Sequence, residues 1–495
     1  MRMRRTTILA LTASLLSTTE AFTIQQKQNA GAPKVVSLQT ERLSVPNPVA
    51  RDRLRRRGMN EVTLDNVICG YYINVTIGTP GRNFSLHLDT GSSDTWVNAP
   101  SSNLCQEKSR PCDFSGTYLA NDSSTYEYIG NNFDITYVDG SGARGDYASD
   151  TFTIGNTKLN RLQFGIGYSS TNAQGLVGIG YALSEVQTRV GLPTYNNLPV
   201  QMVADGLINS NAYSIWLNDL DAPTGTILFG GVDAAKYEGD LLTLPVQTPE
   251  KGEYKNLMVT MTGLSLSQSR SSSNGNGNGD NTTQFSKDNL ALAVLLDTGS
   301  TLSYLPREIV KPLYDAIGVT IMPNPKGNLD AYVPCSFRSS SQSVIFSFSS
   351  QLQITVPMSE LVLNQTTNNK LPRMPDGVTD ACLFGIQERN VNCTGSNTLG
   401  DTFLRSAYVV FDLDNNEISM AQTRFNATTT DLKEIKKGKG GVPGAKAVEN
   451  PVESTSGLSD DEGGIYVNGA AGELRVGMGM AWGLFVGVAM VFLGL

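Results

Sequence analysis

The tetrapeptide Asp-Thr-Gly-Ser occurs twice in this chain, each time directly behind an apolar run. The first copy, residues 89–92, follows Leu86 and Leu88, and the second copy, residues 297–300, follows residues 294–296. Such a short apolar run predicts a buried strand that ends at the Asp. The Gly two positions later lets the backbone turn sharply and approach a neighbouring segment closely. Two such junctions predict a β-rich chain built from two related halves, each presenting one Asp at a strand end.

The two aspartates, Asp89 and Asp297, are candidates for one shared catalytic site. Two carboxylates within hydrogen-bonding distance do not both ionise easily, so they share a proton. The ionised member then activates a water molecule, while the protonated member polarises a carbonyl group. The Thr and Ser residues beside each Asp offer hydroxyls and backbone N–H groups that can hold the carboxylates in place. This chemistry needs no metal and no covalent intermediate, so we expect no cofactor.

A second repeated feature supports the duplication. Residues 175–180 read Gly-Leu-Val-Gly-Ile-Gly, and residues 398–403 read Thr-Leu-Gly-Asp-Thr-Phe. Each half therefore carries an apolar pair followed by Gly, downstream of its Asp motif. The same internal order in both halves predicts two lobes related by a pseudo-twofold axis, with a cleft between them.

With these motifs and three further segments, the chain resembles the pepsin family of aspartic endopeptidases over residues 66–423. Residues 71–80 resemble the family's opening strand, residues 135–142 its flap hairpin, and residues 403–412 its late helix and strand. The resemblance implies an all-β, bilobal fold with pseudo-twofold symmetry and a central cleft covered by a β-hairpin flap. It also implies hydrolysis of peptide bonds at acidic pH. The insertions and tail are most similar to the fungal cell-surface branch of yapsin-like proteases, which carry a glycosylphosphatidylinositol (GPI) anchor.

The resemblance implies a role for each residue of the two Asp motifs. Asp89 and Asp297 would form the catalytic dyad, and Thr301 would lie beside Asp297 near bound substrate. The supporting residues would be Thr90 and Thr298 as cross-braces between the two loops, Gly91 and Gly299 in the turns, and Ser92 as a hydrogen-bond donor to Asp89.

Residues of the expected flap would contact substrate. Tyr137 would be the flap tyrosine and Trp96 its hydrogen-bond partner; the alternatives are an exposed hairpin aromatic for Tyr137 and a plain core residue for Trp96. Gly140 would belong to the same substrate-binding hairpin. Asp139 would aim its carboxylate at the substrate residue before the scissile bond and favour Lys or Arg there. The alternative is that Asp139 only makes the Asp-Gly turn of the hairpin.

Composition argues against several other functions. Charged residues make up 17% of the chain, the net charge is −8 and the pI is about 5.0, so no basic groove for nucleic acid is expected. The only histidine, His87, lies in the strand before Asp89 and is expected to be structural, which excludes a Ser-His or Cys-His catalytic pair. No metal site is expected. The partners would be protein or peptide substrates of a monomeric enzyme. Two alternatives stay open: a catalytically inactive surface binding module on the same fold, and a soluble vacuolar protease.

The N-terminal end carries processing signals. A basic start followed by an apolar run predicts a signal peptide over residues 1–21. Residues 22–57 hold eight Lys and Arg against two Asp and Glu and end in an Arg-rich run, which predicts an inhibitory propeptide cleaved after Arg57. Such a propeptide can lie in a negative cleft at neutral pH and loosen when carboxylates protonate; the alternative is a disordered basic linker. The N-terminal lobe would then span residues 58–240 and the C-terminal lobe residues 241–426.

The C-terminal end predicts anchoring to the cell surface. Residues 427–468 are rich in Lys, Gly, Thr and acidic residues and indicate a disordered stalk. Small residues, a short polar spacer and an uncharged apolar end are typical of a GPI signal, with Asn468 as the attachment site and residues 469–495 removed. The alternative is a single transmembrane helix. The GPI lipid would hold the enzyme on the extracellular face of the plasma membrane or in the cell wall.

Cysteines and glycosylation sequons agree with a secretory route. The family pattern would pair four of the six cysteines, as Cys105 with Cys112 and Cys335 with Cys382, and leaves Cys69 and Cys393 unassigned. Seven Asn-x-Ser/Thr sequons predict N-glycosylation. They lie at Asn74, Asn83, Asn121, Asn281, Asn364, Asn392 and Asn426.

Overall fold

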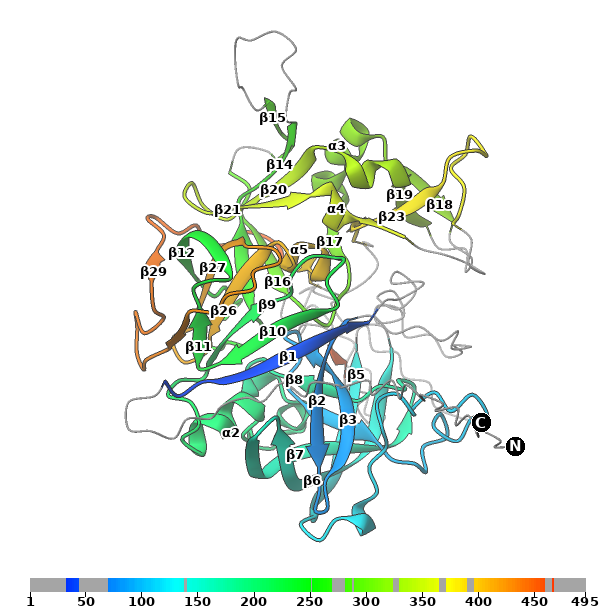
Figure 1. Ribbon diagram of the computed structural model, residues 1–495, viewed down its shortest axis with the longest axis vertical. Helices are drawn as coiled ribbons and strands as arrows, with labels where there is room; N and C mark the ends of the chain where they lie inside the picture. Colours follow the sequence, from blue (N-terminus) through cyan, green and yellow to red (C-terminus); the bar gives the residue numbers. More distant parts are fainter. Residues whose placement is uncertain are drawn as a thin grey trace, which may run out of the picture.

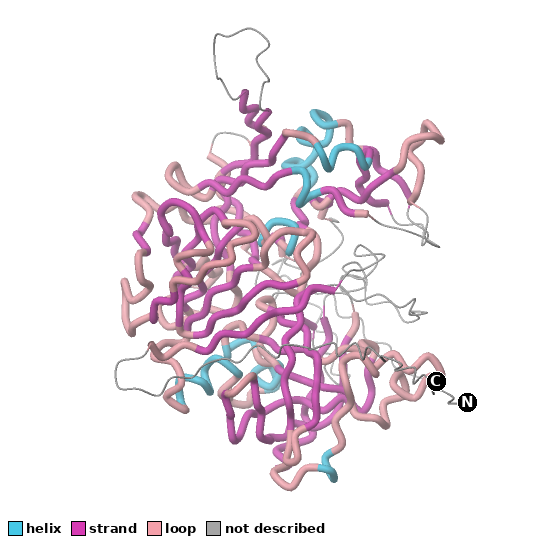
Figure 2. The backbone as a smooth tube through the Cα atoms, in the orientation of Figure 1, coloured by secondary structure: helices cyan, strands magenta, loops and turns pink. Residues whose placement is uncertain are grey.

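The structure is a computed structural model. It describes residues 33–43, 70–137, 140–250, 252–268, 281–286, 289–323, 329–364, 371–389, 396–458 and 465–466. Strands make up most of the regular structure in these ranges, and the helices are short (Figure 2). In Figure 1 the N-terminal lobe (blue to cyan) lies below, the C-terminal lobe (green to yellow) lies above, and strands of one large sheet run through the middle. This arrangement confirms the all-β, bilobal fold.

The large sheet contains fifteen strands of the described chain and joins the two lobes. In spatial order they are β29 (Ala445–Ala447), β12 (Tyr237–Pro245), β27 (Glu417–Thr423), β26 (Ala407–Asp412), β9 (Ala212–Trp216), β10 (Thr224–Phe229), β1 (Val36–Leu43), β2 (Gly70–Ile77), β3 (Arg82–Asp89), β8 (Leu176–Gly178), β4 (Thr95–Asn98), β7 (Thr157–Ser170), β6 (Gly142–Ile154), β5 (Glu127–Tyr137) and β30 (Ile465–Tyr466). The late strand β26 pairs antiparallel with the earlier β9, so both halves of the chain share one hydrogen-bonded sheet. The predicted lobe boundary at residue 240 falls inside β12.

Smaller sheets build the rest of the described molecule. One holds β13 (Met258–Met261), β16 (Leu292–Leu296), β25 (Thr398–Leu399), β17 (Ser303–Leu305) and β24 (Ile386–Glu388). A second holds β15 (Asn281–Gln284), β14 (Gly263–Gln268), β20 (Gln342–Ser347) and β21 (Gln353–Pro357). A third holds β18 (Thr320–Pro323), β19 (Leu329–Pro334), β23 (Ala381–Phe384) and β22 (Val362–Leu363), and a two-stranded pair joins β11 (Gly231–Asp233) with β28 (Leu432–Glu434). The helices are α2 (Leu198–Ala204), α3 (Arg307–Ile317), α4 (Met358–Leu361) and α5 (Asp401–Leu404), with 3₁₀ turns η1 (Ala120–Asp122), η2 (Ala182–Ser184), η3 (Val186–Val190) and η4 (Cys335–Ser339).

The two strands that carry the aspartates are built in the same way. β3 pairs in parallel with β8, and β16 pairs in parallel with β25. Each partner strand also pairs antiparallel with the short strand after the Asp loop, β4 in one lobe and β17 in the other. A Cβ on Gly178 would lie 2.6 Å from backbone atoms of Ser93, and one on Gly400 would lie 2.3 Å from the carbonyl oxygen of Ser300. Only Gly permits these approaches, which explains why Gly follows the apolar pair in both halves.

Strand β1 comes from the segment predicted to be a propeptide. It lies between β10 and β2 and pairs with β10 at six positions and with β2 at three. Val36, Leu38 and Thr40 are buried and alternate with more exposed residues, as the two-residue period of a strand requires. This part of the segment is therefore a strand of the large sheet, whereas the sequence predicted a chain lying in the cleft or a disordered linker. The rest of the segment and the signal peptide lie outside the described residues.

Residues 427–458, predicted to belong to a disordered stalk, instead pack along the body of the molecule. Within them β28 pairs antiparallel with β11, and β29 pairs in parallel with β12. Their side chains at Ile435, Val442 and Val448 are buried. These widely spaced apolar residues anchor a segment whose overall composition is polar, and composition alone does not detect them.

Candidate active site

The loops after β3 and β16 bring Asp89 and Asp297 to one place. The amide of Gly91 donates to Asp89 Oδ1 at 2.8 Å, and the amide of Gly299 donates to Asp297 Oδ1 at 2.7 Å. Each carboxylate is therefore held by the turn that follows it. A Cβ on Gly91 would lie only 2.6 Å from Asp297 Oδ1, which places the second carboxylate against the first loop. A side chain at position 91 would displace Asp297.

Thr90 and Thr298 form reciprocal hydrogen bonds between the two loops. The amide of Thr90 donates to Thr298 Oγ1 at 3.1 Å, and the amide of Thr298 donates to Thr90 Oγ1 at 3.0 Å. The hydroxyl of Thr90 donates to the carbonyl of Leu296 at 2.8 Å, and that of Thr298 donates to the carbonyl of Leu88 at 2.9 Å. All four bonds are buried, so they fix the two loops, and with them the two carboxylates, relative to each other.

The serines of the two motifs differ in their contacts. Ser92 Oγ donates to Asp89 Oδ2 at 2.6 Å, so both oxygens of Asp89 accept a bond from their own loop. Ser300 Oγ instead donates to the carbonyl oxygen of Leu302 at 3.3 Å. Two identical tetrapeptides thus surround their carboxylates with different donors.

Helix α5 is hydrogen-bonded to the second Asp loop. The amide of Asp401 donates to the carbonyl of Ser300 at 2.9 Å, and the amide of Thr402 donates to the carbonyl of Thr301 at 3.1 Å. Thr301, predicted to lie near bound substrate, is buried in this structure. Its backbone is therefore fixed by α5.

A buried ion pair follows α5. Arg405 Nε lies 2.5 Å from Glu360 Oε2, Arg405 Nη2 donates to the carbonyl oxygen of Glu360 at 2.6 Å, and both side chains are at most 3% exposed. The other carboxylate oxygen of Glu360 accepts the amide of Leu220 at 3.0 Å. Leu220 lies in the loop between β9 and β10, so the pair ties the support of the second Asp loop to the large sheet.

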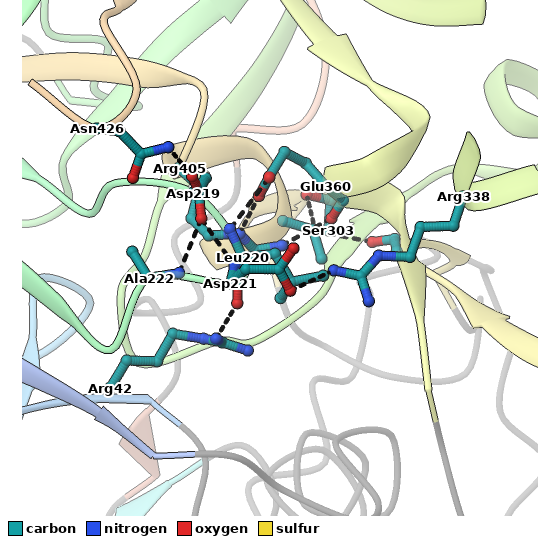
Figure 3. Close-up of polar contacts among 12 residues, drawn as sticks. Arg42, Asp219, Leu220, Asp221, Ala222, Ser303, Arg338, Glu360, Arg405 and Asn426 are labelled. Atoms are coloured by element: carbon teal, nitrogen blue, oxygen red, sulfur yellow. Dashed lines mark hydrogen bonds and ion pairs between the residues drawn. The ribbon is translucent and has the colours of Figure 1, made fainter. Parts of the chain in front are cut away.

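Side chains from distant parts of the chain meet on that β9–β10 loop, and Figure 3 shows them approaching from different directions. They are Arg42 of β1, which donates to the carbonyl of Leu220; Arg338, which pairs with Asp221 at 2.6 Å; and Asn426, which donates to Asp219. This network was not predicted from the sequence, because its members are far apart along the chain.

Tyr137, at the end of β5, is 3% exposed and packs in an aromatic and aliphatic cluster, so it is not an exposed hairpin residue. Trp96 Nε1 donates to the Tyr137 hydroxyl at 2.7 Å, which makes Trp96 both a core residue and the partner of Tyr137. Gly140 has a φ of 73°, and its amide donates to the carbonyl of Tyr137 at 2.8 Å, which closes the turn. Asp139 lies outside the described residues, so its role stays a prediction.

Two buried carboxyl groups that were not predicted as site residues, Asp94 and Glu185, lie close to the flap hairpin. Burial raises the pKa of Asp94, and burial raises the pKa of Glu185 to about 10. Asp94 lies between the first Asp motif and Trp96 in the sequence, and this position is the one signal that could have drawn attention to it.

The structure contains the disulfides Cys105–Cys112 and Cys335–Cys382. Cys69 and Cys393 lie outside the described residues. Five sequon residues are exposed, namely Asn74, Asn83, Asn121, Asn364 and Asn426. The side chains of the other two, Asn281 and Asn392, are not among those described, and glycosylation stays a prediction at all seven sites.

Comparison with known proteins places this arrangement in a family. Residues 70–423 match the family described as "Eukaryotic aspartyl protease". The chain is 46% identical over 478 residues to the "Probable aspartic-type endopeptidase opsB" of Aspergillus oryzae, which covers 95% of this chain and 92% of the relative. It is 42% identical over 453 residues to the OPSB endopeptidase of Arthroderma benhamiae, covering 90% and 87%. It is 32% identical over 407 residues to "Secreted aspartic protease 1" of Candida albicans, covering 80% and 93%.

A bilobal β fold with two apposed Asp-Thr-Gly-Ser loops defines an aspartic endopeptidase, a hydrolase of peptide bonds. The chain belongs to the eukaryotic aspartyl protease family, the pepsin family, and the resemblance seen in its sequence is confirmed.

Proposed function

We propose that the protein is a secreted, surface-anchored endopeptidase that cleaves proteins at acidic pH with Asp89 and Asp297. The observation that carries the chemistry is the close approach of the Asp297 carboxylate to Gly91. The reciprocal hydrogen bonds of Thr90 and Thr298 hold the two loops in this arrangement. The two carboxyl groups share one proton. The ionised one takes a proton from a water molecule that attacks the scissile carbonyl carbon, and the protonated one donates to the carbonyl oxygen. The C–N bond then breaks as the leaving nitrogen takes the proton that the first carboxyl removed from the water, and the second carboxyl regains its proton from a hydroxyl of the tetrahedral carbon.

Digestion of a peptide library at about pH 4, between the pKa values typical of such a dyad, tests this proposal. We expect cleavage that is blocked by a peptide analogue with a hydroxyl-bearing tetrahedral carbon in place of the scissile carbonyl. A metal chelator should leave the rate unchanged. Activity that resists the analogue, or that requires neutral pH, would contradict the dyad mechanism. The cleaved bonds would also give the subsite preferences.

Processing at the N-terminal end is part of the proposal. The basic segment is hydrogen-bonded into the large sheet through β1, so an uncut chain carries this strand between β10 and β2. We expect the active secreted form to begin at Gly58, after the Arg-rich run. N-terminal sequencing of the active form checks this. A fully active protein that retains residues 22–57 would refute it.

The proposal of anchoring rests on the C-terminal sequence. The proposal of secretion rests on the sequence and on the relatives. Relatives of this chain include a protein named as a secreted protease. The ranges that the structure covers hold no helix long and apolar enough to cross a membrane. The proposed attachment site Asn468 and the tail beyond it are not described. We expect a phosphatidylinositol-specific phospholipase to release the protein from membranes, and mass spectrometry to find no peptide beyond Asn468. Recovery of an intact Leu495 would instead support a transmembrane anchor.

A preference for basic substrates is proposed for Asp139. It lies two residues after Tyr137, and a partly desolvated carboxylate there would form a charge-assisted hydrogen bond worth about 1.5–3 kcal/mol. Paired peptides with Lys or Leu before the scissile bond would measure this as a ratio of kcat/KM. We expect the Lys-to-Leu ratio to fall about tenfold or more in Asp139→Thr. An unchanged ratio would leave Asp139 with a turn-forming role only.

A further inference from the structure

Asp94 is a fully buried carboxyl group at the junction of three parts of the N-terminal lobe. It lies five residues after Asp89 and is 0% exposed. Its Oδ1 accepts bonds from the hydroxyls of Tyr147 at 2.6 Å and Tyr195 at 2.9 Å, and its Oδ2 accepts the amide of Val186 at 2.9 Å. One side chain therefore binds the loop after the catalytic aspartate to two segments that are distant in sequence.

The first of these segments is β6, the strand that leads out of the flap hairpin. Tyr147 belongs to β6, which pairs with β5, the strand that ends at Tyr137. The Tyr147 ring packs edge-on against Phe133 of β5, with ring centroids 5.2 Å apart. The ring centroids of Phe133 and Trp96 are 6.4 Å apart. Trp96 donates to the hydroxyl of Tyr137. A continuous packed path therefore runs from Asp94 to the flap tyrosine.

The second segment runs from Glu185 to Tyr195. Asp94 holds both of its ends, through the amide of Val186 and the hydroxyl of Tyr195. Glu185 Oε2 accepts the amide of Tyr195 at 2.8 Å, so a second buried carboxyl group closes the same segment. Val186 belongs to the cluster that contains Tyr137 and Trp96. The segment is therefore packed against the flap as well as bonded to Asp94.

No Lys or Arg forms an ion pair with Asp94 in the part of the chain that the structure describes. The titratable and charged groups that face it are Tyr147, Tyr195, Glu185 and Arg189. Burial raises the pKa of Asp94, while the three hydrogen bonds and Arg189 offset only part of that rise. The pKa of Glu185 is raised to about 10 by burial, so Glu185 is neutral in acid and at neutral pH.

We propose that Asp94 is a positioning residue for the flap, whose protonated form holds the Tyr147 strand and the 185–195 segment together and whose ionised form loosens them. The hydroxyls of Tyr147 and Tyr195 can accept as well as donate, so the site can hold the proton of a neutral Asp94 without losing a bond. An ionised Asp94 places a charge in a buried site with no cation paired to it. The proposal rests on the endopeptidase activity of the family and does not require the assigned roles of the two catalytic aspartates.

The sign of the pH dependence follows from proton binding. The native state, with a raised pKa at Asp94, binds more protons than the unfolded state between the ordinary Asp range and the raised value. The free energy of unfolding therefore falls as pH rises through this window, and the loss is centred on the flap. Because the flap would close over substrate, we expect kcat/KM to fall on the alkaline side with a rise in KM, before the whole molecule unfolds.

The variant Asp94→Asn, measured against Glu185→Gln, tests the proposal. Asn keeps the shape and an acceptor for the tyrosines but cannot ionise, so the alkaline limb of kcat/KM should move to higher pH by about one unit, or about tenfold in rate at a fixed pH on that limb. Glu185→Gln removes a neighbouring carboxyl that is already neutral there, so it should leave the limb in place. Asn has one accepting oxygen where Asp94 has two, so its NH2 group faces either the amide of Val186 or the two tyrosine hydroxyls; some loss of stability at every pH is expected and is not diagnostic.

An unmoved alkaline limb in a folded Asp94→Asn protein, or a folded variant that is inactive at every pH, would overturn the proposal. If Asp94→Asn fails to fold, Tyr147→Phe carries the test. It keeps the ring but removes a donor to the ionised form of Asp94, so the limb should again move to higher pH, with KM raised because one link to the flap is lost. An unchanged limb and an unchanged KM in Tyr147→Phe would refute the proposal. Failure of the proposed Asp89–Asp297 mechanism would appear differently: the tetrahedral analogue would not inhibit the wild-type enzyme.

Discussion

The two lobes carry the same tetrapeptide, but they support it with different chemistry. In the N-terminal lobe the buried carboxyl near the Asp loop, Asp94, is bonded to two tyrosine hydroxyls and one amide. In the C-terminal lobe the buried carboxyl behind the loop, Glu360, is paired with Arg405. A guanidinium keeps its charge at every accessible pH, whereas a carboxyl without a paired cation depends on its proton. The first support therefore depends on a proton at Asp94, whereas the second is a buried ion pair.

The two lobes therefore share some features of the duplicated motif and differ in others. The backbone around the reacting groups matches closely, down to the reciprocal bonds of Thr90 and Thr298 and the Gly that follows each apolar pair. The groups farther out do not match. The backbone and the threonine bonds are therefore symmetric where the two carboxylates meet, whereas the side-chain contacts differ, from Ser92 and Ser300 outward to the groups that hold each loop in its own lobe.

The largest expected effect falls on the reacting groups, where the two lobes should behave alike. Asp89→Asn and Asp297→Asn should each lower kcat by at least about a hundredfold, because an amide can neither share the proton nor act as the base, and acid–base catalysis is worth about 10²–10⁴. Peptide hydrolysis at the pH optimum measures this, with circular dichroism as the control for folding. A variant that keeps more than about a hundredth of the wild-type rate would contradict the assignment of that Asp.

The next effect should appear in the C-terminal lobe alone. Glu360→Gln leaves Arg405 as an uncompensated buried charge, which should lower the free energy of unfolding by about 3–5 kcal/mol. Lys311→Ala is the control, because the Lys311–Asp315 pair is exposed and worth about 1 kcal/mol at most. Denaturant unfolding of both variants at one pH gives both numbers. Equal losses in the two variants would show that the buried pair adds nothing to the fold.

The sequence predicts the symmetric part of the molecule well, for a physical reason. Each Asp loop is specified locally, by an apolar strand, a turn residue and hydroxyls within a few positions, so Asp89 and Asp297 could be placed at strand ends from the chain alone. The cross-bonds of Thr90 and Thr298 and the bond from Ser92 to Asp89 were implied by the family resemblance. The disulfide pairs followed from the family resemblance. Trp96 and Tyr137 meet as the resemblance implied.

The asymmetric part could not be predicted, because its contacts join distant segments. Tyr147 and Tyr195 lie 53 and 101 residues from Asp94, and nothing in the local sequence links them. The packing of residues 427–458 depends on a few apolar side chains within a polar segment, so composition indicated disorder where the sheet provides partners. The basic charge of residues 22–57 predicted a segment lying in the cleft or a disordered linker. The alternating burial of β1 instead places part of this segment in the large sheet.

The disulfides sharpen the comparison further, because each lobe holds one. The loop closed by Cys335–Cys382 has a sequence separation of 47, and that closed by Cys105–Cys112 has a separation of 7. Loop-closure entropy then predicts losses of about 4 and about 2.4 kcal/mol when each pair is replaced by Ser. Thermal unfolding of the two double variants compares them. A larger loss at Cys105 and Cys112 would mean that native-state contacts outweigh chain entropy.

The smallest effect concerns the two serines of the repeated tetrapeptide. Ser92 donates to the carboxylate of Asp89 at 2.6 Å, whereas Ser300 donates to a backbone carbonyl at 3.3 Å. Hydrogen bonds to charged groups are worth about 1.5–3 kcal/mol, so Ser92→Ala should lower kcat by about ten- to a hundredfold. Ser300→Ala loses a bond between neutral groups, worth about 0.5–1.5 kcal/mol of stability, and should leave kcat within about threefold of wild type. Measured kcat and melting temperature for both variants separate catalysis from folding. Equal losses of kcat would mean that the asymmetry at the serines has no part in the reaction, and that only the groups farther from the carboxylates distinguish the lobes.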